Sequence, residues 1–221
     1  MQDIDRGHVE PGGPTLTRLA DAGGREVAVR KLSVGMMDNN CYVLVDPPTS
    51  QALLVDAADE PERILAEVGD LEVVAIVTTH GHPDHWQALD GVAEETGAPV
   101  HLHPADAEMV PRRADVAVED GARLRFGQAE ATLLHTPGHT PGSVCVLLAG
   151  ERPWLLTGDT LFPGGPGKTT APDQFAQIMD SLERRVFDRL PDATQVCPGH
   201  GDDTTLGAER PHLDEWRARG W

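Results

Sequence analysis

The sequence predicts an α/β fold in which two β-sheets pack together and helices lie outside them. Short strand-like runs occur in both halves of the chain, and each half also contains segments with helical spacing. Their order is strands, helix, strand, helix, then strands, helix, strand, which suits two packed sheets with outer helices. The run LEVVAIVTTH at 71–80 is apolar over most of its length, as expected for a strand covered on both faces.

The expected elements follow one another at short intervals. Residues 1–24 are rich in Gly and Pro and lack apolar periodicity, so we expect a tail or lead-in there. Apolar spacing predicts helices over 60–68, from 83 to 97 and over 172–188. Strands are expected at VAVRKLSV (27–34), CYVLVD (41–46), ALLVDA (52–57), LEVVAIVTTH (71–80), PVHLHP (99–104), ARLRFG (122–127), AEATLLHT (129–136), SVCVLLAG (143–150), PWLLTGD (153–159) and TQVCPG (194–199).

Charge and composition limit the classes of partner. The 221 residues carry a formal net charge of −18, and no basic run interrupts the acidic balance. A nucleic-acid binder needs Lys and Arg to replace counterions along the phosphates, and anionic membranes also attract basic segments. No segment approaches the roughly 20 apolar residues that span a bilayer, and the N-terminus shows no secretory signal. We therefore expect a cytoplasmic protein that binds neither nucleic acid nor membranes.

The three cysteines are expected to be structural. Cys41, Cys145 and Cys197 lie far apart, each in or beside a strand-like run, and none has CxxC spacing. A thiolate metal site therefore does not follow from them, and buried thiols in a reducing compartment explain them well.

The stretch TTHGHPDHW at 78–86 concentrates metal-binding side chains directly after a predicted buried strand. His80 and His82 are two residues apart, so in an extended segment both side chains point the same way. Asp84 and His85 follow where the chain turns into a helix, and they can reach a second point nearby. Imidazoles with a carboxylate and no thiolate suit zinc, iron or manganese. The alternative is a polar loop whose aspartate favours the first turn of a helix.

Three further polar residues lie at the exits of predicted strands. They are His139 in TPGHTPG, Asp159 in LLTGDT and His200 in VCPGHG, and glycines flank each of them. Strand exits on one side of a sheet converge, so these loops can meet the 78–86 stretch at one edge. Together the two sets predict a metal site. The other histidines are not part of such a set of candidate ligands. His101, His103 and His135 are expected to be structural, and His8 and His212 are expected to have no specific role.

With these residues aligned, the chain resembles the metallo-β-lactamase fold superfamily and, within it, the glyoxalase II-like hydrolases. The matching motifs are LLVDAAD, THGHPDH, TPGHTPG, GDTLF and PGHG, which occur in family order between residues 53 and 201. The resemblance implies an αββα sandwich of two mixed sheets, with the site at the edge between them. We accordingly expect residues 25–221 to form one domain, without the C-terminal helical domain that binds glutathione in full-length glyoxalase II.

The resemblance also implies roles for individual residues. It implies two divalent metal ions, foremost zinc, with iron or manganese as alternatives. Asp84 and Asp159 are the carboxylates expected to act in catalysis, and Asp56 matches an aspartate that orients the ligands without binding metal. By motif position, the first ion would be held by His80, His82 and His139, the second by Asp84, His85 and His200, and Asp159 would bridge the two.

The implied reaction is attack of a metal-bound hydroxide on the carbonyl carbon of a small thioester or ester. Lys168 in GDTLFPGGPGKTTAP matches a basic position that contacts substrate in glyoxalase II enzymes; the alternative is a solvated loop lysine. Thr169 and Thr170 stand where that family has an aromatic pair, so glutathione specificity does not follow. The resemblance leaves a homo-oligomer open.

The main alternative is a persulfide dioxygenase of the same fold. Those enzymes resemble this chain in the same motifs but hold one iron at the equivalents of His80, His139 and Asp159. Their next loop usually carries a cysteine and an arginine, and Pro166 and Lys168 occupy those places here. A β-lactamase would normally be exported, and an RNA-processing nuclease would need a basic groove. A degenerate, non-enzymatic module would have lost a ligand, and every ligand of the motif set is present.

Overall fold

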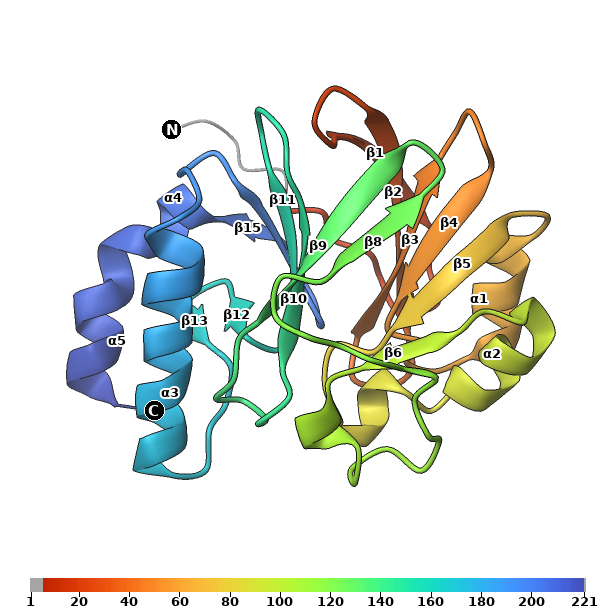
Figure 1. Cartoon of the computed structure of the whole chain (residues 1–221). Helices are drawn as coiled ribbons and strands as arrows, with labels where there is room; N and C mark the ends of the chain where they lie inside the picture. Colours follow the sequence, from red (N-terminus) through yellow and green to blue (C-terminus); the bar gives the residue numbers. More distant parts are fainter. Residues whose placement is uncertain (1–5, 221) are drawn as a thin grey trace.

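The computed structural model describes residues 6–220, which form four layers: helices, a β-sheet, a second β-sheet and helices (Figure 1). This arrangement confirms the predicted fold class. No helix within the described residues is long and apolar enough to cross a bilayer.

The first sheet has seven strands in the order β1-β2-β3-β4-β5-β6-β7. Its first four strands form an antiparallel meander, and β5, β6 and β7 then add in parallel. The strands are β1 (Leu16–Asp21), β2 (Glu26–Val34), β3 (Asn39–Asp46), β4 (Gln51–Val55), β5 (Glu72–Val77), β6 (Val100–Leu102) and β7 (Val116–Ala117).

The second sheet has six strands in the order β15-β14-β11-β10-β9-β8, and a separate hairpin pairs β12 with β13. Within this sheet β11 and β14 are parallel, and the other neighbours are antiparallel. The strands are β8 (Arg123–Phe126), β9 (Ala129–His135), β10 (Val144–Leu148), β11 (Trp154–Gly158), β12 (Leu161–Phe162), β13 (Gly165–Pro166), β14 (Gln195–Pro198) and β15 (Thr204–Thr205).

Helices cover the outer face of each sheet (Figure 1). Those on the first sheet are α1 (Pro61–Val68) and α2 (Leu89–Thr96), while the 3₁₀ turns η1 (Pro83–His85) and η2 (Pro104–Asp106) follow β5 and β6. Those on the second are α3 (Pro172–Ser181), which continues as the π-helical turn η3 (Leu182–Phe187), then α4 (Leu206–Glu209), the 3₁₀ turn η4 (Arg210–His212) and α5 (Leu213–Arg219).

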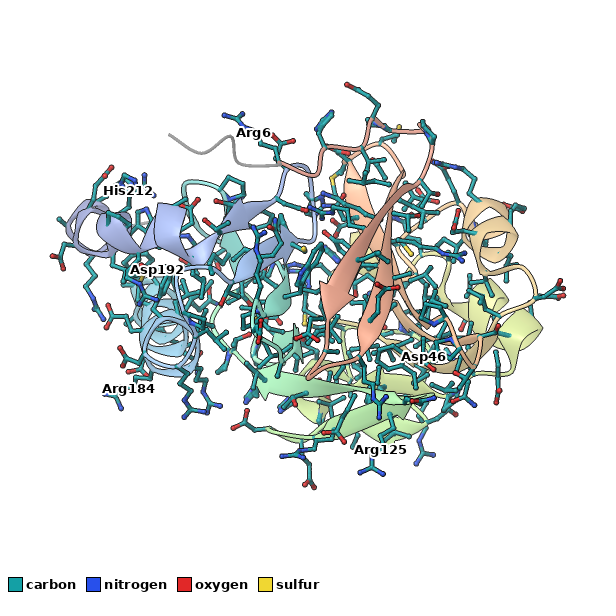
Figure 2. All side chains as sticks on the ribbon, turned by 90° about the horizontal axis from the view of Figure 1, so that it is seen from above. Arg6, Asp46, Arg125, Arg184, Asp192 and His212 are labelled. Carbon is teal, nitrogen blue, oxygen red and sulfur yellow. The ribbon has the colours of Figure 1, made fainter. Side chains whose placement is uncertain are left out.

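Three apolar cores follow from this layering, and β3 shows why. Its eight residues are all buried because alternate side chains enter different cores. Cys41 and Val43 pack toward α1 and α2, whereas Tyr42 and Leu44 pack between the two sheets. The third core joins the second sheet to α3, η3 and α5. Burying one such side chain fully is worth about 1.5–3 kcal/mol. Charged side chains such as those of Arg125 and Arg184 project from the outside (Figure 2).

The structure corrects the expectation of a tail over residues 1–24. Leu16–Asp21 is an edge strand that pairs with β2 over six residue pairs, from Leu16↔Lys31 to Asp21↔Glu26. Gly7 is also tied down, since its carbonyl accepts a hydrogen bond from the buried Lys31 Nζ at 2.9 Å. The lead-in therefore belongs to the first sheet over 16–21, and residues 1–5 lie outside the described part.

Other expectations hold with local changes. The helix expected from 83 to 97 is split into η1 and α2, and the one over 172–188 changes to π geometry at Leu182. The polar chain end is helical, and Trp216 in α5 is buried. The prediction of buried thiols is confirmed, since all three cysteines are buried and free.

Candidate metal centre

The seven side chains expected as ligands come together at one edge of the two sheets, where β5, β11 and β14 end. They form three overlapping groups of three, and in each group the candidate ligand atoms lie within 4.8 Å of one another. The groups are His80, His82 and His139 (the first triad); Asp84, His85 and His200 (the second triad); and His80, His85 and Asp159, which joins them.

The first triad combines the exit of β5 with the turn between β9 and β10. His82 Nδ1 lies 3.1 Å from His80 Nε2 and 2.9 Å from His139 Nε2. His80 is buried, and the side chain of His139 is only 8% exposed, so both rings are largely shielded from solvent. Three ring nitrogens thus surround one point.

The second triad uses η1 and the loop after β14. Pro83 is the first residue of η1, where the missing N–H costs nothing, and Asp84 and His85 follow in this turn. His85 Nε2 lies 3.2 Å from His200 Nε2. Asp84 Oδ2 lies 3.3 Å from His200 Nε2 and 3.6 Å from His85 Nε2. Two ring nitrogens and a carboxylate oxygen therefore surround a second point.

Asp159, which directly follows β11, lies between the triads. Its Oδ2 is 3.5 Å from His139 Nε2 and 3.5 Å from His200 Nε2, and its Oδ1 is 3.4 Å from His85 Nε2. Oδ1 is also buried without a hydrogen-bond partner in the described structure. A buried carboxylate oxygen without a donor is costly unless a cation approaches it.

Hydrogen bonds on the outer side of the imidazoles decide which nitrogen faces inward. Nδ1 of His85 donates to Asp56 Oδ2 at 2.9 Å, that of His200 to the Met37 carbonyl at 2.8 Å, and that of His139 to the Lys168 carbonyl at 2.7 Å. These oxygens can only accept, so Nδ1 carries a proton in each ring, and Nε2 is the nitrogen that faces the centre and binds a cation once it holds no proton. The inward-facing ring nitrogens, only about 3 Å apart within each triad, form a compact donor set for a cation. The residues therefore fit a metal centre.

Asp56 lies beneath both triads, at the exit of β4. It is buried, and its φ of 58° is a left-handed conformation that aspartate tolerates better than most residues. Its carboxylate accepts from Thr79 N at 2.7 Å, Thr79 Oγ1 at 2.8 Å and His85 Nδ1 at 2.9 Å. Since the Thr79 hydroxyl proton goes to Asp56, its oxygen can accept from His80 Nδ1 at 3.1 Å. Asp56 thus orients one histidine directly and another through Thr79.

The electrostatics of the metal-free side chains differ between the triads. Burial lowers the pKa of His80 and of His139 below the ordinary histidine range. Burial also lowers the pKa of His85, but the Asp56 and Asp159 carboxylates outweigh it and raise that pKa well above its ordinary value. In the same way, Asp159 and Asp84 overcome burial and raise the pKa of His200 to about 10.

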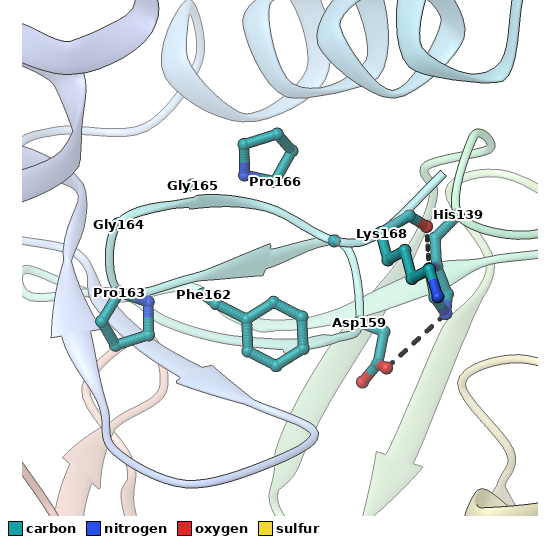
Figure 3. A pocket seen from close by; sticks show the side chains of 9 residues that line it. His139, Asp159, Phe162, Pro163, Gly164, Gly165, Pro166 and Lys168 are labelled. Carbon is teal, nitrogen blue, oxygen red and sulfur yellow. Dashed lines mark hydrogen bonds and ion pairs between the residues drawn. The ribbon is translucent and has the colours of Figure 1, made fainter. Parts of the chain in front are cut away.

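A cavity of about 310 Å³ opens beside the centre (Figure 3). His139 and Asp159 line one end, and the β12–β13 hairpin with Phe162 and Pro163 lines the rest. Lys168 also lines it, with an exposed side chain, and its backbone carbonyl holds His139. Contact of its ammonium group with substrate stays a prediction.

Sequence reasoning missed several residues that support the ligands. Asn39 donates its amide to the Asp84 carbonyl at 2.9 Å and to Asp84 Oδ2 at 3.1 Å. Met37 and Lys168 act through backbone carbonyls, which every residue type has, so no sequence pattern marks these two positions. Asn39 lies more than forty positions from its partner, and no spacing rule links the two.

The remaining histidines join none of the candidate metal groups within residues 6–220. The rings of His103 and His135 stack at 3.9 Å with an interplanar angle of 12°. His135 Nε2 donates to the Pro141 carbonyl at 2.9 Å, a contact that braces the turn carrying His139. His8 is bonded to Asp202 at 2.6 Å on the surface.

Comparisons with known proteins agree with this geometry. The family model of the metallo-beta-lactamase superfamily matches residues 34–200. The probable metallo-hydrolase YqgX of Bacillus subtilis is 33% identical over 204 residues, which cover 82% of this chain and 93% of that protein. The crystal structure of ETHE1 from Myxococcus xanthus is 34% identical with a TM-score of 0.74, covering 84% of this chain and 82% of that one. TTHA1623, solved in a di-iron-bound form, is 32% identical with a TM-score of 0.68, covering 81% and 96%. The chain therefore belongs to the metallo-beta-lactamase superfamily.

Proposed function

We propose that this protein is a binuclear metal-dependent hydrolase that cleaves a small thioester or ester. The observation that carries the proposal is the presence of two complete triads with one carboxylate, Asp159, between them. The name of the related metallo-hydrolase YqgX supports the reaction class. We assign His80, His82 and His139 to one ion, Asp84, His85 and His200 to the other, and Asp159 to both.

The side chains of this centre have separable tasks in such a reaction. Divalent ions held by these residues would lower the pKa of a bound water and would polarise the carbonyl group of the substrate. Asp56 holds His85 with Nε2 turned inward, and the Lys168 carbonyl does the same for His139. Asp159 and Asp84 bring negative charge, which favours the binding of divalent cations and offsets the cost of removing those cations from water. Imidazole and carboxylate donors favour zinc, with iron or manganese as alternatives.

The cavity beside the centre suits a small acyl group. Phe162, Pro163 and Pro166 give it an apolar wall against which a short chain can pack. The exposed Lys168 ammonium at its margin can attract a carboxylate on the substrate. The strongly acidic surface makes a nucleic-acid substrate unfavourable.

The second candidate is a mononuclear iron persulfide dioxygenase. In that case His80, His139 and Asp159 would hold a single iron, and the second triad would stay without metal. The di-iron-bound form of the related TTHA1623 makes iron a relevant ion for this donor set.

One paired measurement separates the two candidates. Metal content per chain is determined on protein purified without added metal and after reconstitution with zinc or iron. The same samples are assayed for anaerobic hydrolysis of glutathione and coenzyme A thioesters and for oxygen uptake with glutathione persulfide. Two ions per chain with anaerobic thioester cleavage support the hydrolase. One iron with oxygen uptake and no thioester cleavage would overturn it.

A further inference from the structure

Asp106 is a buried carboxylate that belongs to neither triad. It is the last residue of η2, after β6, and its exposed fraction is 0%. Its side chain lies between the two loops that carry the first triad. One loop runs from the end of β5 through His80 and His82, and the other is the β9–β10 turn with His139.

The Asp106 carboxylate bonds to both loops. Oδ2 accepts from the backbone N–H of Gly81 at 2.8 Å and from Thr140 Oγ1 at 2.6 Å. Oδ1 accepts from the backbone N–H of Gly142 at 2.7 Å. Gly81 separates the two histidines of the first loop, and Thr140 directly follows His139. A single carboxylate therefore fixes the distance between the backbones that present these rings.

Two glycines make this close approach feasible. A Cβ atom at Gly142 would lie 2.6 Å from Asp106 Cγ, and one at Gly81 would lie 3.1 Å from Asp106 Cβ. A side chain at position 142 would therefore displace the carboxylate, and one at position 81 would also meet Met109 Cβ at 2.6 Å. The hydroxyls of Thr140 and Ser143, 2.8 Å apart, complete the contact on the turn side.

The energetics favour a specific role over incidental packing. A fully buried carboxylate is expensive unless every oxygen is satisfied. Here three donors converge on it, and hydrogen bonds to a charged acceptor are roughly twice as strong as neutral ones. Removing one acceptor would leave a buried N–H or hydroxyl without a partner, so the two loops would move apart to reach water.

We propose that Asp106 is a positioning residue that sets the spacing between His80 and His82 on one loop and His139 on the other. It serves the first triad as Asp56 serves His85 in the second. The proposal rests on the proposed metal centre. On this proposal, binding of the ion at the first triad depends on a carboxylate that contacts neither the ion nor a ligand side chain.

The test is Zn²⁺ binding by Asp106→Asn, followed by competition with a chromophoric chelator. Asparagine keeps the size of the side chain but replaces one acceptor oxygen by an NH₂ group, which must face a donor. We expect one site to bind about 10–100-fold more weakly and the other to keep its affinity. Thr140→Val, which removes one of the three bonds and leaves the carboxylate in place, should weaken the same site by a smaller factor.

Asp46→Asn is the matched control. Asp46 is also a buried aspartate, and it accepts from Thr49 Oγ1 at 2.6 Å and Gln128 N at 3.3 Å. It lies at the opposite end of β3 from Asn39, about 23 Å along the strand. Its loss should lower the thermal midpoint without changing either zinc affinity.

The outcomes separate the two proposals. Two tight sites in the wild type together with unchanged affinities in both Asp106→Asn and Thr140→Val would overturn the positioning role. Equal weakening of both sites would also overturn it, because the effect would then be general. A wild type that binds no zinc or iron would instead refute the metal centre itself. If Asp106→Asn fails to fold, Thr140→Val alone decides the question.

Discussion

The two triads share one stretch of sequence and one bridging carboxylate, yet they are supported in different ways. The first consists of imidazoles alone, and the groups that bond directly to its rings are neutral: the Thr79 hydroxyl at His80 and a backbone carbonyl at His139. The second contains a carboxylate, and the Asp56 carboxylate directly orients His85. The first triad therefore contains no carboxylate ligand, whereas the second contains Asp84.

This difference sets how each triad competes with protons. Burial lowers the pKa of His80 and His139, so these rings are neutral near pH 7 and can accept a cation at once. Neighbouring carboxylates raise the pKa of His85 and His200, so these rings hold protons in the metal-free protein. Protons thus replace the missing positive charge in the second triad, and a metal ion must displace them.

The largest expected effect comes from removing the carboxylate that both triads share. Asp159→Ala leaves His85, His139 and His200 without their common negative neighbour, so both ions lose a ligand. We expect a loss of hydrolysis of about 1,000-fold or more together with a lower metal content per chain. Steady-state thioester hydrolysis and elemental analysis of the same sample measure both.

The control for this change is Asp90→Ala, which removes an exposed aspartate on α2 that pairs with Arg112 at 3.4 Å. It should leave activity and metal content unchanged. Full activity with unchanged metal content in Asp159→Ala would contradict the bridging position, and loss of only one ion would assign Asp159 to a single triad.

A smaller effect, confined to the second triad, is expected from pH. The pKa of His200 is about 10 in the metal-free protein, so below that pH a metal ion must displace its proton. For each proton that the metal ion displaces, the metal affinity of this triad should fall about tenfold when the pH is lowered by one unit. The first triad should show no such slope near pH 7. Calorimetry in buffers of different ionisation enthalpy counts the protons released per ion.

The raised pKa of His200 also predicts that the stability of the metal-free protein falls as pH rises, whereas its metal affinity increases. A folded-state pKa raised from 6.5 to about 10 contributes stability that is complete below pH 6.5 and is lost as pH rises through 10. The metal-free protein should therefore unfold at lower temperature as pH increases across this window, and the zinc-loaded protein should not. A thermal midpoint in chelator that rises with pH would contradict this charge assignment.

The parts of the structure that the sequence predicts well are those with local signals. Alternating side chains after a buried strand placed His80 and His82, and glycine-flanked strand exits placed His139, Asp159 and His200. Each signal needs only a few neighbouring residues. The layered fold follows from the same kind of signal, because runs such as that of β3 are apolar on both faces.

Weak or non-local signals account for what was missed. The edge strand β1 alternates poorly, with Leu19 60% exposed, although Gly23-Gly24 before β2 is a hairpin signal that would have revealed it. Asp106 resembles any aspartate in a short helical turn, and only the fold brings it to Gly81 and Thr140. Supporting contacts of this kind depend on tertiary structure, so no local pattern can predict them.

The smallest expected effect tests whether the neutral support of the first triad is separate from the charged support of the second. Thr79→Val keeps the shape of the side chain but removes the hydroxyl between His80 Nδ1 and Asp56 Oδ2. His80 loses its acceptor, while Asp56 keeps its bonds to the Thr79 backbone N–H and to His85. One buried hydrogen bond is worth about 1 kcal/mol, so we expect roughly fivefold weaker zinc binding at the first triad alone.

Thr78→Val is the neighbouring control, because the Thr78 hydroxyl is buried and has no hydrogen-bond partner in the described structure. Its removal should leave both zinc affinities unchanged. If Thr79→Val weakened both sites equally, Thr79 would act mainly by holding Asp56, and the two supports would be one network. If only the first site weakened, each triad would have its own support beneath the shared Asp159, and either ion could be lost without the other.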